Sequence, residues 1–158
     1  MRSIGLLLVA VGVANAMLLH APHAPRTAPT VARSADVAMS VQVRTIKAGD
    51  GKTFPKAGQM VKAHYTGKLQ SDGSVFDTSR KIFGGFGGIG AFEFQIGAGD
   101  VIKGWDVGIA KMSVGEVAEL TVGPSFGYGS RGAGDAIPPN AVLIFEVELL
   151  GVSGKPFF

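Results

Sequence analysis

From Val41 onward, apolar and polar residues alternate along much of the chain. The clearest alternating segments are Val61 to Thr66, Ala118 to Val122 and Leu143 to Leu149, with Val41 to Lys47 and Phe92 to Ile96 as two further candidates. A period of two places the apolar side chains on one face of an extended strand. The pattern therefore predicts about five half-buried antiparallel strands, separated by turns such as Gly49-Asp50-Gly51 and Ser71-Asp72-Gly73.

One segment departs from this alternation. Between Asp100 and Met112, the apolar residues Ile102, Trp105, Ile109 and Met112 recur at steps of three, four and three. This spacing predicts a short amphipathic helix, with Asp100 as its N-cap and Lys111 near its end. A sheet whose apolar face has one helix to pack against is an α+β domain.

The first 39 residues differ in composition from the rest. Residues 1–16 contain Arg2, an apolar run from Ile4 to Ala14 and the small-x-small sequence Ala14-Asn15-Ala16, a pattern typical of a secretory signal peptide and too short to span a bilayer. Residues 17–39, rich in Ala, Pro, Ser, Thr and Arg, resemble a transit peptide or a disordered leader. We therefore expect a folded domain at residues 40–158. A signal followed by a transit-like segment favours import into a plastid with extra bounding membranes, and secretion or another organelle lumen is the alternative.

Composition excludes several kinds of chemistry. The chain has no cysteine, and His64 is the only histidine after residue 39, so a Cys-ligated metal, a thiolate nucleophile and a multi-histidine site are ruled out in the domain. Of the 15 Lys and Arg residues, three precede residue 40, as does one of the 12 Asp and Glu residues. The remaining 12 basic and 11 acidic residues are interspersed, which argues against nucleic-acid binding. We expect no metal and no cofactor.

A glycine-rich motif precedes the strand predicted at Phe92 to Ile96. Residues 85–90 fit the pattern G-x-G-x-x-G of dinucleotide-binding proteins. That motif must follow a strand and open a helix, whereas residues 91–96 alternate like a strand. The motif is therefore not interpreted as a cofactor site.

Aromatic residues and short motifs remain as the candidate chemistry. The blocks VQVRTIKAGDGKTFPKAGQMVKAHYTGKL, GSVFDTSR, FEFQIGAGDVIKGWDVGIAKMSVGE and FGYGSRGAGDAIPPNAVLIFEVELL follow one another from Val41 to Leu150. In this order they resemble the FKBP-type peptidyl-prolyl isomerases, the tacrolimus-binding immunophilins. The resemblance implies an antiparallel sheet of about five strands wrapped around one short helix, with a shallow apolar pocket between them.

The resemblance also assigns roles to individual residues. It implies a catalytic set of Trp105 at the pocket floor, Phe76 and Asp77 at one rim and Tyr128 at the other. It further implies substrate-binding positions at Tyr65, Phe92, Val101, Ile102, Ile137 and Phe145, with the Tyr128 hydroxyl and the Ile102 backbone N–H as donors to substrate carbonyls. The expected activity is isomerisation of X-Pro bonds in polypeptides by desolvation and twisting in the apolar pocket, which would assist protein folding. A docking or assembly module with weak or no activity is the alternative. Tacrolimus-like macrolides are expected ligands, and a monomer without a membrane span is expected.

Two regions depart from the compact members of that family. Residues 81–91 form a longer, Gly-rich insertion that we expect to be a mobile flap, and no basic partner for Asp77 is evident there, which leaves Arg80 or Lys81 as substitutes. Residues 133–136 are small or polar, which is expected to alter the preference for the residue before proline.

Overall fold

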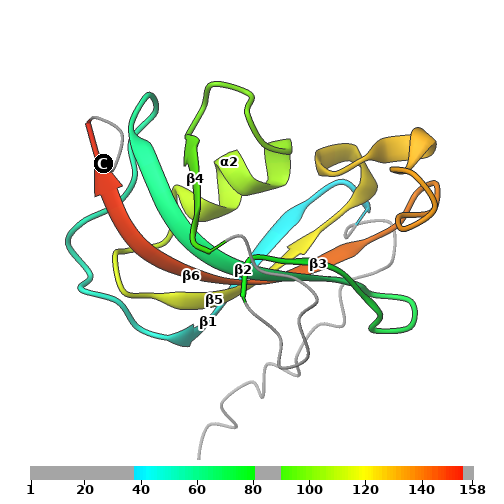
Figure 1. Ribbon diagram of the computed structural model, residues 1–158, viewed down its shortest axis with the longest axis horizontal. Coiled ribbons are helices and arrows are strands. Elements are labelled where there is room, and N and C mark those ends of the chain that lie inside the picture. Colours follow the sequence, from blue (N-terminus) through cyan, green and yellow to red (C-terminus); the bar gives the residue numbers. More distant parts are fainter. Residues whose placement is uncertain (1–37, 81–89, 155–158) are drawn as a thin grey trace, which may run out of the picture. The chain divides into compact units, whose positions relative to one another are not determined.

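The computed structural model describes residues 38–80 and 90–154, all within a compact unit that comprises Val31–Phe158. In chain order, the elements are strands β1 (Val41–Lys47), β2 (Met60–Leu69), β3 (Val75–Thr78) and β4 (Phe92–Gln95), helix α2 (Lys103–Ile109), strand β5 (Val117–Val122), the 3₁₀ turns η1 (Pro124–Phe126) and η2 (Gly129–Arg131), and strand β6 (Leu143–Ser153). The predicted α+β class is confirmed (Figure 1).

The strands form one antiparallel sheet in the order β1-β5-β6-β2-β3, and β4 also pairs with β2. Strand β2 is central: β6 pairs along one of its edges, and β4 and β3 pair in succession along the other. The sheet curves around one side of α2 (Figure 1). This curvature leaves room for a cavity between the inner face of the sheet and the segments beside the helix.

Two glycines allow α2 to lie close to the sheet. A Cβ at Gly104 would come within 2.5 Å of a Val122 methyl carbon, and one at Gly108 within 2.8 Å of a Leu120 methyl carbon. Because the helix backbone lies close to β5 at these two positions, the residue after each glycine, Trp105 or Ile109, is buried in the core.

The helix is shorter than its sequence pattern predicts. Its N-cap is Ile102, without a side-chain cap, so the predicted cap at Asp100 is wrong. The Asp100 carboxylate instead accepts the backbone N–H of Gln95 at 3.1 Å, which ties it to the end of β4. The helix ends at Ile109 because the N–H groups of Lys111 and Met112 turn back to carbonyls only three residues earlier, and Lys111 therefore lies outside the helix.

The five predicted strands are confirmed within one or two residues at most ends, and β6 extends further than expected. Strand β3 was missed because its sequence, Val75-Phe76-Asp77-Thr78, has two apolar residues followed by two polar ones and does not alternate. The predicted turns form, with positive φ at Gly51 and Gly73, and the Asp50 and Asp72 carboxylates accept backbone N–H groups two or three residues ahead.

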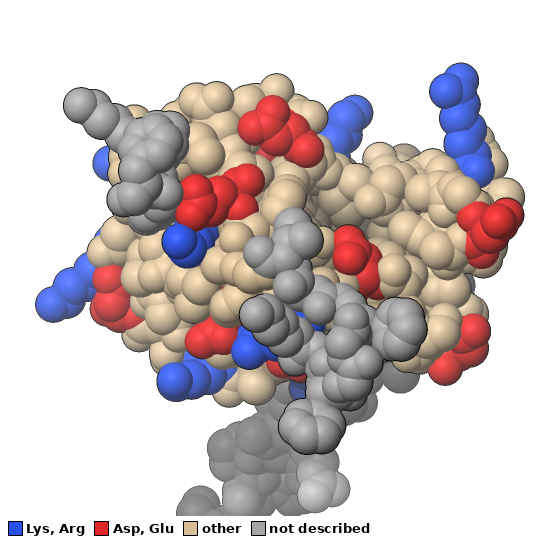
Figure 2. Space-filling model, viewed as in Figure 1, with Lys and Arg blue, Asp and Glu red and all other residues tan. Residues whose placement is uncertain are grey.

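The described residues carry basic and acidic side chains intermingled on the face shown in Figure 2. No helix within the described ranges is long and apolar enough to cross a membrane. The predicted signal peptide, nearly all of the leader and residues 81–89 of the predicted flap lie outside the described residues.

Candidate functional site

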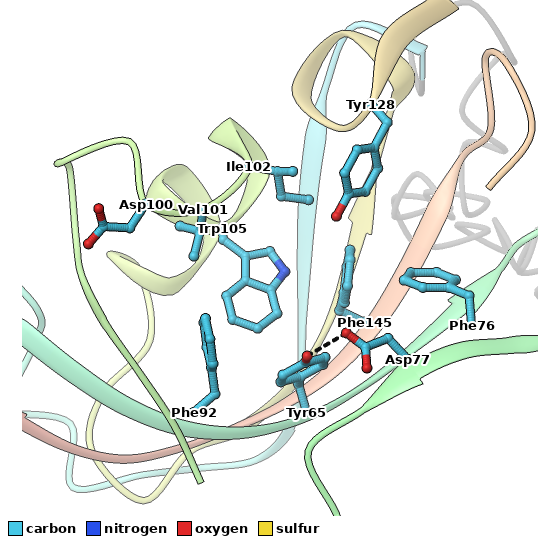
Figure 3. A pocket seen from close by; sticks show the side chains of 10 residues that line it. All are labelled: Tyr65, Phe76, Asp77, Phe92, Asp100, Val101, Ile102, Trp105, Tyr128 and Phe145. Atoms are coloured by element: carbon cyan, nitrogen blue, oxygen red, sulfur yellow. Dashed lines mark hydrogen bonds between the residues drawn. The ribbon is translucent and has the colours of Figure 1, made fainter. Parts of the chain in front are cut away.

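A cavity of about 470 Å³ opens between the curved sheet and the segments around α2. Its wall contains aromatic and aliphatic side chains together with two carboxylates (Figure 3): Tyr65, Phe76, Asp77, Phe92, Asp100, Val101, Ile102, Trp105, Tyr128 and Phe145. These residues come from β2, β3, β4, β6, α2 and the loops before α2 and after η1. Residues 80 positions apart in the chain therefore meet in one site.

Trp105 forms the floor, and its side chain is held by four aromatic neighbours. Its ring centroid lies 4.9 Å from that of Tyr65 and 5.4 Å from that of Phe145, both in edge-to-face geometry, and Phe92 and Phe94 lie at 6.0 and 5.6 Å. Such pairs stabilise beyond simple area burial. The residue is only 4% exposed, so the floor is part of the core and presents an apolar surface.

The indole nitrogen has no conventional partner. Trp105 Nε1 is the only buried side-chain nitrogen or oxygen without a hydrogen bond among the described residues. Figure 3 shows this edge of the indole turned toward Phe145, whose ring stands at 87° to it. The face of an aromatic ring is a weak acceptor for an N–H group. The floor therefore offers no accessible polar atom to water in the cavity.

One rim is organised by a short hydrogen bond. The Tyr65 hydroxyl donates to Asp77 Oδ2 at 2.6 Å, which joins β2 to β3 across the cavity wall (Figure 3). Burial, followed by this hydrogen bond and the charge of Asp77, raises the pKa of Tyr65 well above its ordinary value. The hydroxyl consequently remains a donor at all ordinary pH values.

Tyr128 lies at the opposite rim with 40% of its surface exposed. Burial of part of the side chain raises the pKa of Tyr128, and the charge of Asp77 adds to the effect. The Tyr128 hydroxyl points into the cavity (Figure 3). It is therefore placed to donate to a ligand carbonyl.

The backbone also provides a donor. As the N-cap residue of α2, Ile102 accepts the N–H groups of Trp105 and Asp106 with its carbonyl, and the helix makes no use of its own N–H. This group belongs to a residue that lines the cavity. The predicted N–H donor is therefore in the right region.

Nine of the ten sequence-predicted site residues line the cavity, and Ile137 does not. Ile137 is 5% exposed and belongs to the core cluster, and its backbone pairs in both directions with Ala133. Its placement at the rim therefore stays a prediction. Asp100 was missed as a lining residue because its position before the helix was interpreted as a cap.

Arg80, one of the two basic residues expected to pair with Asp77, pairs with a different carboxylate. Arg80 Nη2 lies 2.6 Å from Glu148 Oε2 on the other face of the sheet. Lys81, the other candidate, lies outside the described residues. His64 contacts Ser79 Oγ through Nδ1 at 3.1 Å and is not part of the cavity wall, as its alternation with Tyr65 predicts.

The chain is similar to known proteins over most of this domain. The family model described as FKBP-type peptidyl-prolyl cis-trans isomerase matches residues 51–150. FK506-binding protein 1 of Dictyostelium discoideum is 53% identical over 112 residues, which cover 71% of this chain and 97% of that protein. FK506-binding protein 1A of Emericella nidulans is 53% identical over 115 residues (73% and 100%), and the peptidyl-prolyl cis-trans isomerase Fkbp12 of Drosophila melanogaster is 52% identical over 114 residues (72% and 99%).

Proposed function

The chain belongs to the FKBP-type peptidyl-prolyl cis-trans isomerases, and from this premise we propose that its aromatic cavity accelerates rotation about X-Pro bonds by binding the bond in a dehydrated site. The observation that carries the proposal is the floor: a buried indole enclosed by four rings, with no accessible polar atom. A planar amide is more polar than a twisted one, so an apolar surface favours the twisted state.

The required energy is modest for this kind of site. Rotation about an X-Pro bond has a barrier of roughly 18–20 kcal/mol, which corresponds to about 0.01 per second at the upper limit. Reaching about 10³ per second requires removal of roughly 7 kcal/mol. Desolvation and two or three oriented donors can supply that amount without a nucleophile or proton transfer.

The residues divide the task in the following way. The prolyl ring lies on Trp105, with Tyr65, Phe92, Val101 and Phe145 around it. The Ile102 N–H and the Tyr128 hydroxyl donate to substrate carbonyls. Phe76 and Asp77 form the opposite rim, where the Tyr65 hydroxyl holds the carboxylate at 2.6 Å.

The biological role that follows is assistance to folding of proline-containing polypeptides. The docking-module alternative is less favoured, because a docking surface has no need for a complete set of floor, walls and donors. Tacrolimus, an apolar macrolide, is proposed to compete for the same cavity, as the names of the FK506-binding relatives suggest. The protein is proposed to act as a monomer, which light scattering on the purified protein tests.

The subcellular location is a separate proposal that rests on residues 1–39. Their signal-like and transit-like composition supports entry into the secretory route and onward import into a plastid with extra bounding membranes. Mass spectrometry of the mature N-terminus from native tissue tests this. A terminus near residue 40 supports two processing steps, whereas one near residue 17 supports secretion or another lumen.

The activity is tested by NMR exchange spectroscopy on an X-Pro peptide with the purified protein. Exchange above the uncatalysed rate, and its inhibition by tacrolimus, is the expected result. Because Trp105 is the only tryptophan in the chain, quenching of its fluorescence measures tacrolimus binding directly. Tacrolimus binding without acceleration of exchange would favour the docking module.

A further inference from the structure

Tyr65 links the floor of the cavity to one of its rims (Figure 3). Its ring stands edge-on to Trp105, with the two centroids 4.9 Å apart, and its hydroxyl donates to Asp77 Oδ2 at 2.6 Å. A short hydrogen bond to a carboxylate depends strongly on the distance and angle between its two groups. The position of the Tyr65 backbone therefore decides whether this rim keeps its geometry.

Tyr65 lies in an interval of the sheet that no strand fills. On the edge of β2 that faces β3 and β4, strand β4 pairs with residues 60–63 and β3 pairs with residues 66–68. His64 and Tyr65 lie between these two pairings, while β6 pairs along the opposite edge. Their backbone groups on the first edge need other partners, because an unpaired backbone N–H or carbonyl away from water is costly.

A buried serine supplies those partners to Tyr65. Ser79 Oγ accepts the Tyr65 N–H at 2.8 Å, where a regular antiparallel ladder has a backbone carbonyl. The Tyr65 carbonyl accepts the Ser79 N–H and the Thr78 hydroxyl, each at 3.0 Å. Ser79 is 1% exposed, and its Oγ also lies 3.1 Å from His64 Nδ1 and 3.4 Å from the Tyr65 carbonyl. The end of β3 thus holds the Tyr65 backbone, and Asp77, on the same strand, accepts its hydroxyl.

We propose that Ser79 is a positioning residue of this isomerase, which holds the Tyr65 backbone so that the tyrosine hydroxyl meets the Asp77 carboxylate at the cavity rim. The inference rests on the proposed function, because it concerns the same cavity. Ser79 does not line the cavity, so its effect on the reaction passes through Tyr65. The Tyr65 ring is also held by its aromatic neighbours, and the part that depends on Ser79 is the hydroxyl.

The first measurement is kcat/KM by NMR exchange on a neutral X-Pro peptide, with the full-length protein. Ser79→Ala should lower kcat/KM about 5- to 20-fold, since a small displacement of a positioned group is costly. Ser79→Thr keeps an oxygen on Cβ and should recover kcat/KM to within about threefold of wild type. Thr66→Val is the matched control: it removes a hydroxyl that lies 3.1 Å from Thr78 Oγ1 across the same two strands. It should change kcat/KM less than about twofold.

A double-mutant cycle with Tyr65→Phe separates positioning from stability. Phe keeps the ring and removes the hydroxyl, so in that background Ser79→Ala should lower kcat/KM less than about twofold. A merely structural role of Ser79 predicts the same loss in both backgrounds. Thermal unfolding establishes that each variant is folded at the assay temperature. Where Ser79→Ala is not, Ser79→Cys takes its place in the cycle, because sulfur is a weaker acceptor at the same position.

An NMR signal reports on the same contact without any activity. The chain has two tyrosines, so isotopic labelling of tyrosine at Cζ gives two signals, which Tyr128→Phe assigns. The Cζ shift of a phenol that donates to a carboxylate differs from that of a phenol in water. The Tyr65 signal should therefore move toward that of free tyrosine in Ser79→Ala and stay in place in Thr66→Val.

An unchanged Tyr65 signal in Ser79→Ala, or an equal loss of kcat/KM in the Tyr65→Phe background, would overturn the inference. Failure of the proposed function has a different signature, namely no acceleration of exchange by the wild-type protein. In that case the NMR signal still decides whether Ser79 positions the Tyr65 hydroxyl.

Discussion

Substitution of Trp105 by Phe distinguishes two ways in which the cavity floor can act. If the indole N–H donated to the twisted amide, its removal would reduce kcat/KM by about 10²- to 10³-fold, as for other preorganised donors. The structure places that N–H against Phe145, buried and without a polar partner among the described residues. We therefore expect Trp105→Phe to retain kcat/KM within about tenfold, since Phe preserves an apolar aromatic floor.

The expected loss of stability follows from the packing of the indole. Trp105 is nearly fully buried and contacts four rings, so truncation to Ala should cost about 3–5 kcal/mol of stability. Phe keeps one ring and some edge-to-face contacts, and the smaller volume should cost about 1–3 kcal/mol. A domain with roughly 5–15 kcal/mol of stability tolerates the second loss and is seriously weakened by the first.

The assay is NMR exchange on a neutral X-Pro peptide, with thermal unfolding measured in parallel. Phe94→Leu is the matched control, because Phe94 packs on Trp105 at 5.6 Å in the core but does not line the cavity. It should lower the melting temperature with little effect on kcat/KM. A loss above 100-fold in Trp105→Phe, in a protein that is still folded at the assay temperature, would refute the floor as a purely apolar surface.

The remaining predictions concern a donor, pH, a buried network and the insertion. Tyr128→Phe removes one donor and should lower kcat/KM about two- to tenfold in the same exchange assay, which corresponds to about 0.5–1.5 kcal/mol; no change would remove its hydroxyl from the mechanism. Because the pKa values of Tyr65 and Tyr128 are raised, their hydroxyls stay protonated over the ordinary pH range. We therefore expect kcat/KM to be flat from about pH 6 to 9, both in wild type and in His64→Gln. A bell-shaped profile in wild type that is lost in His64→Gln would contradict the mechanism. The raised values also mean that folding disfavours the phenolates, so thermal melts should show stability maintained below the usual tyrosine value of 10.0 and falling as pH rises above it. Glu116 is 7% exposed, and its carboxylate accepts hydrogen bonds from Thr45 Oγ1 and from the N–H and hydroxyl of Ser113. Glu116→Ala leaves these donors without an acceptor and should lower the free energy of unfolding, measured with denaturant, by about 2–3 kcal/mol. A loss near zero would mean that water replaces the carboxylate. Shortening residues 81–91 should change the preference among X-Pro peptides in the exchange assay, and an unchanged preference would make the insertion passive.

Much of the fold could be predicted from the sequence because its signals are local. The period of two from Val61 to Thr66 determines which face of β2 is buried, and it correctly separates Tyr65 from His64. The steps from Ile102 to Ile109 predict the helix. The order of the aromatic motifs identified the family, and nine of ten predicted site residues line the cavity because each motif has a fixed place on the sheet.

What only the tertiary structure decided is the choice of partner between segments distant in the chain. Asp100 could equally cap a helix or bind the end of β4, and the preceding turn directs it to Gln95. Arg80 could pair with Asp77. Strand β2 pairs with β3 on one side and with β6 on the other, and in this arrangement Arg80 Nη2 lies 2.6 Å from Glu148 Oε2 on the outer face. Ile137 is paired with Ala133 through the backbone and buried in the core cluster, a partner that its apolar character alone does not indicate. In each case the side chain has two acceptable local environments, and the free-energy difference between them comes from sheet register and packing, which local sequence does not encode.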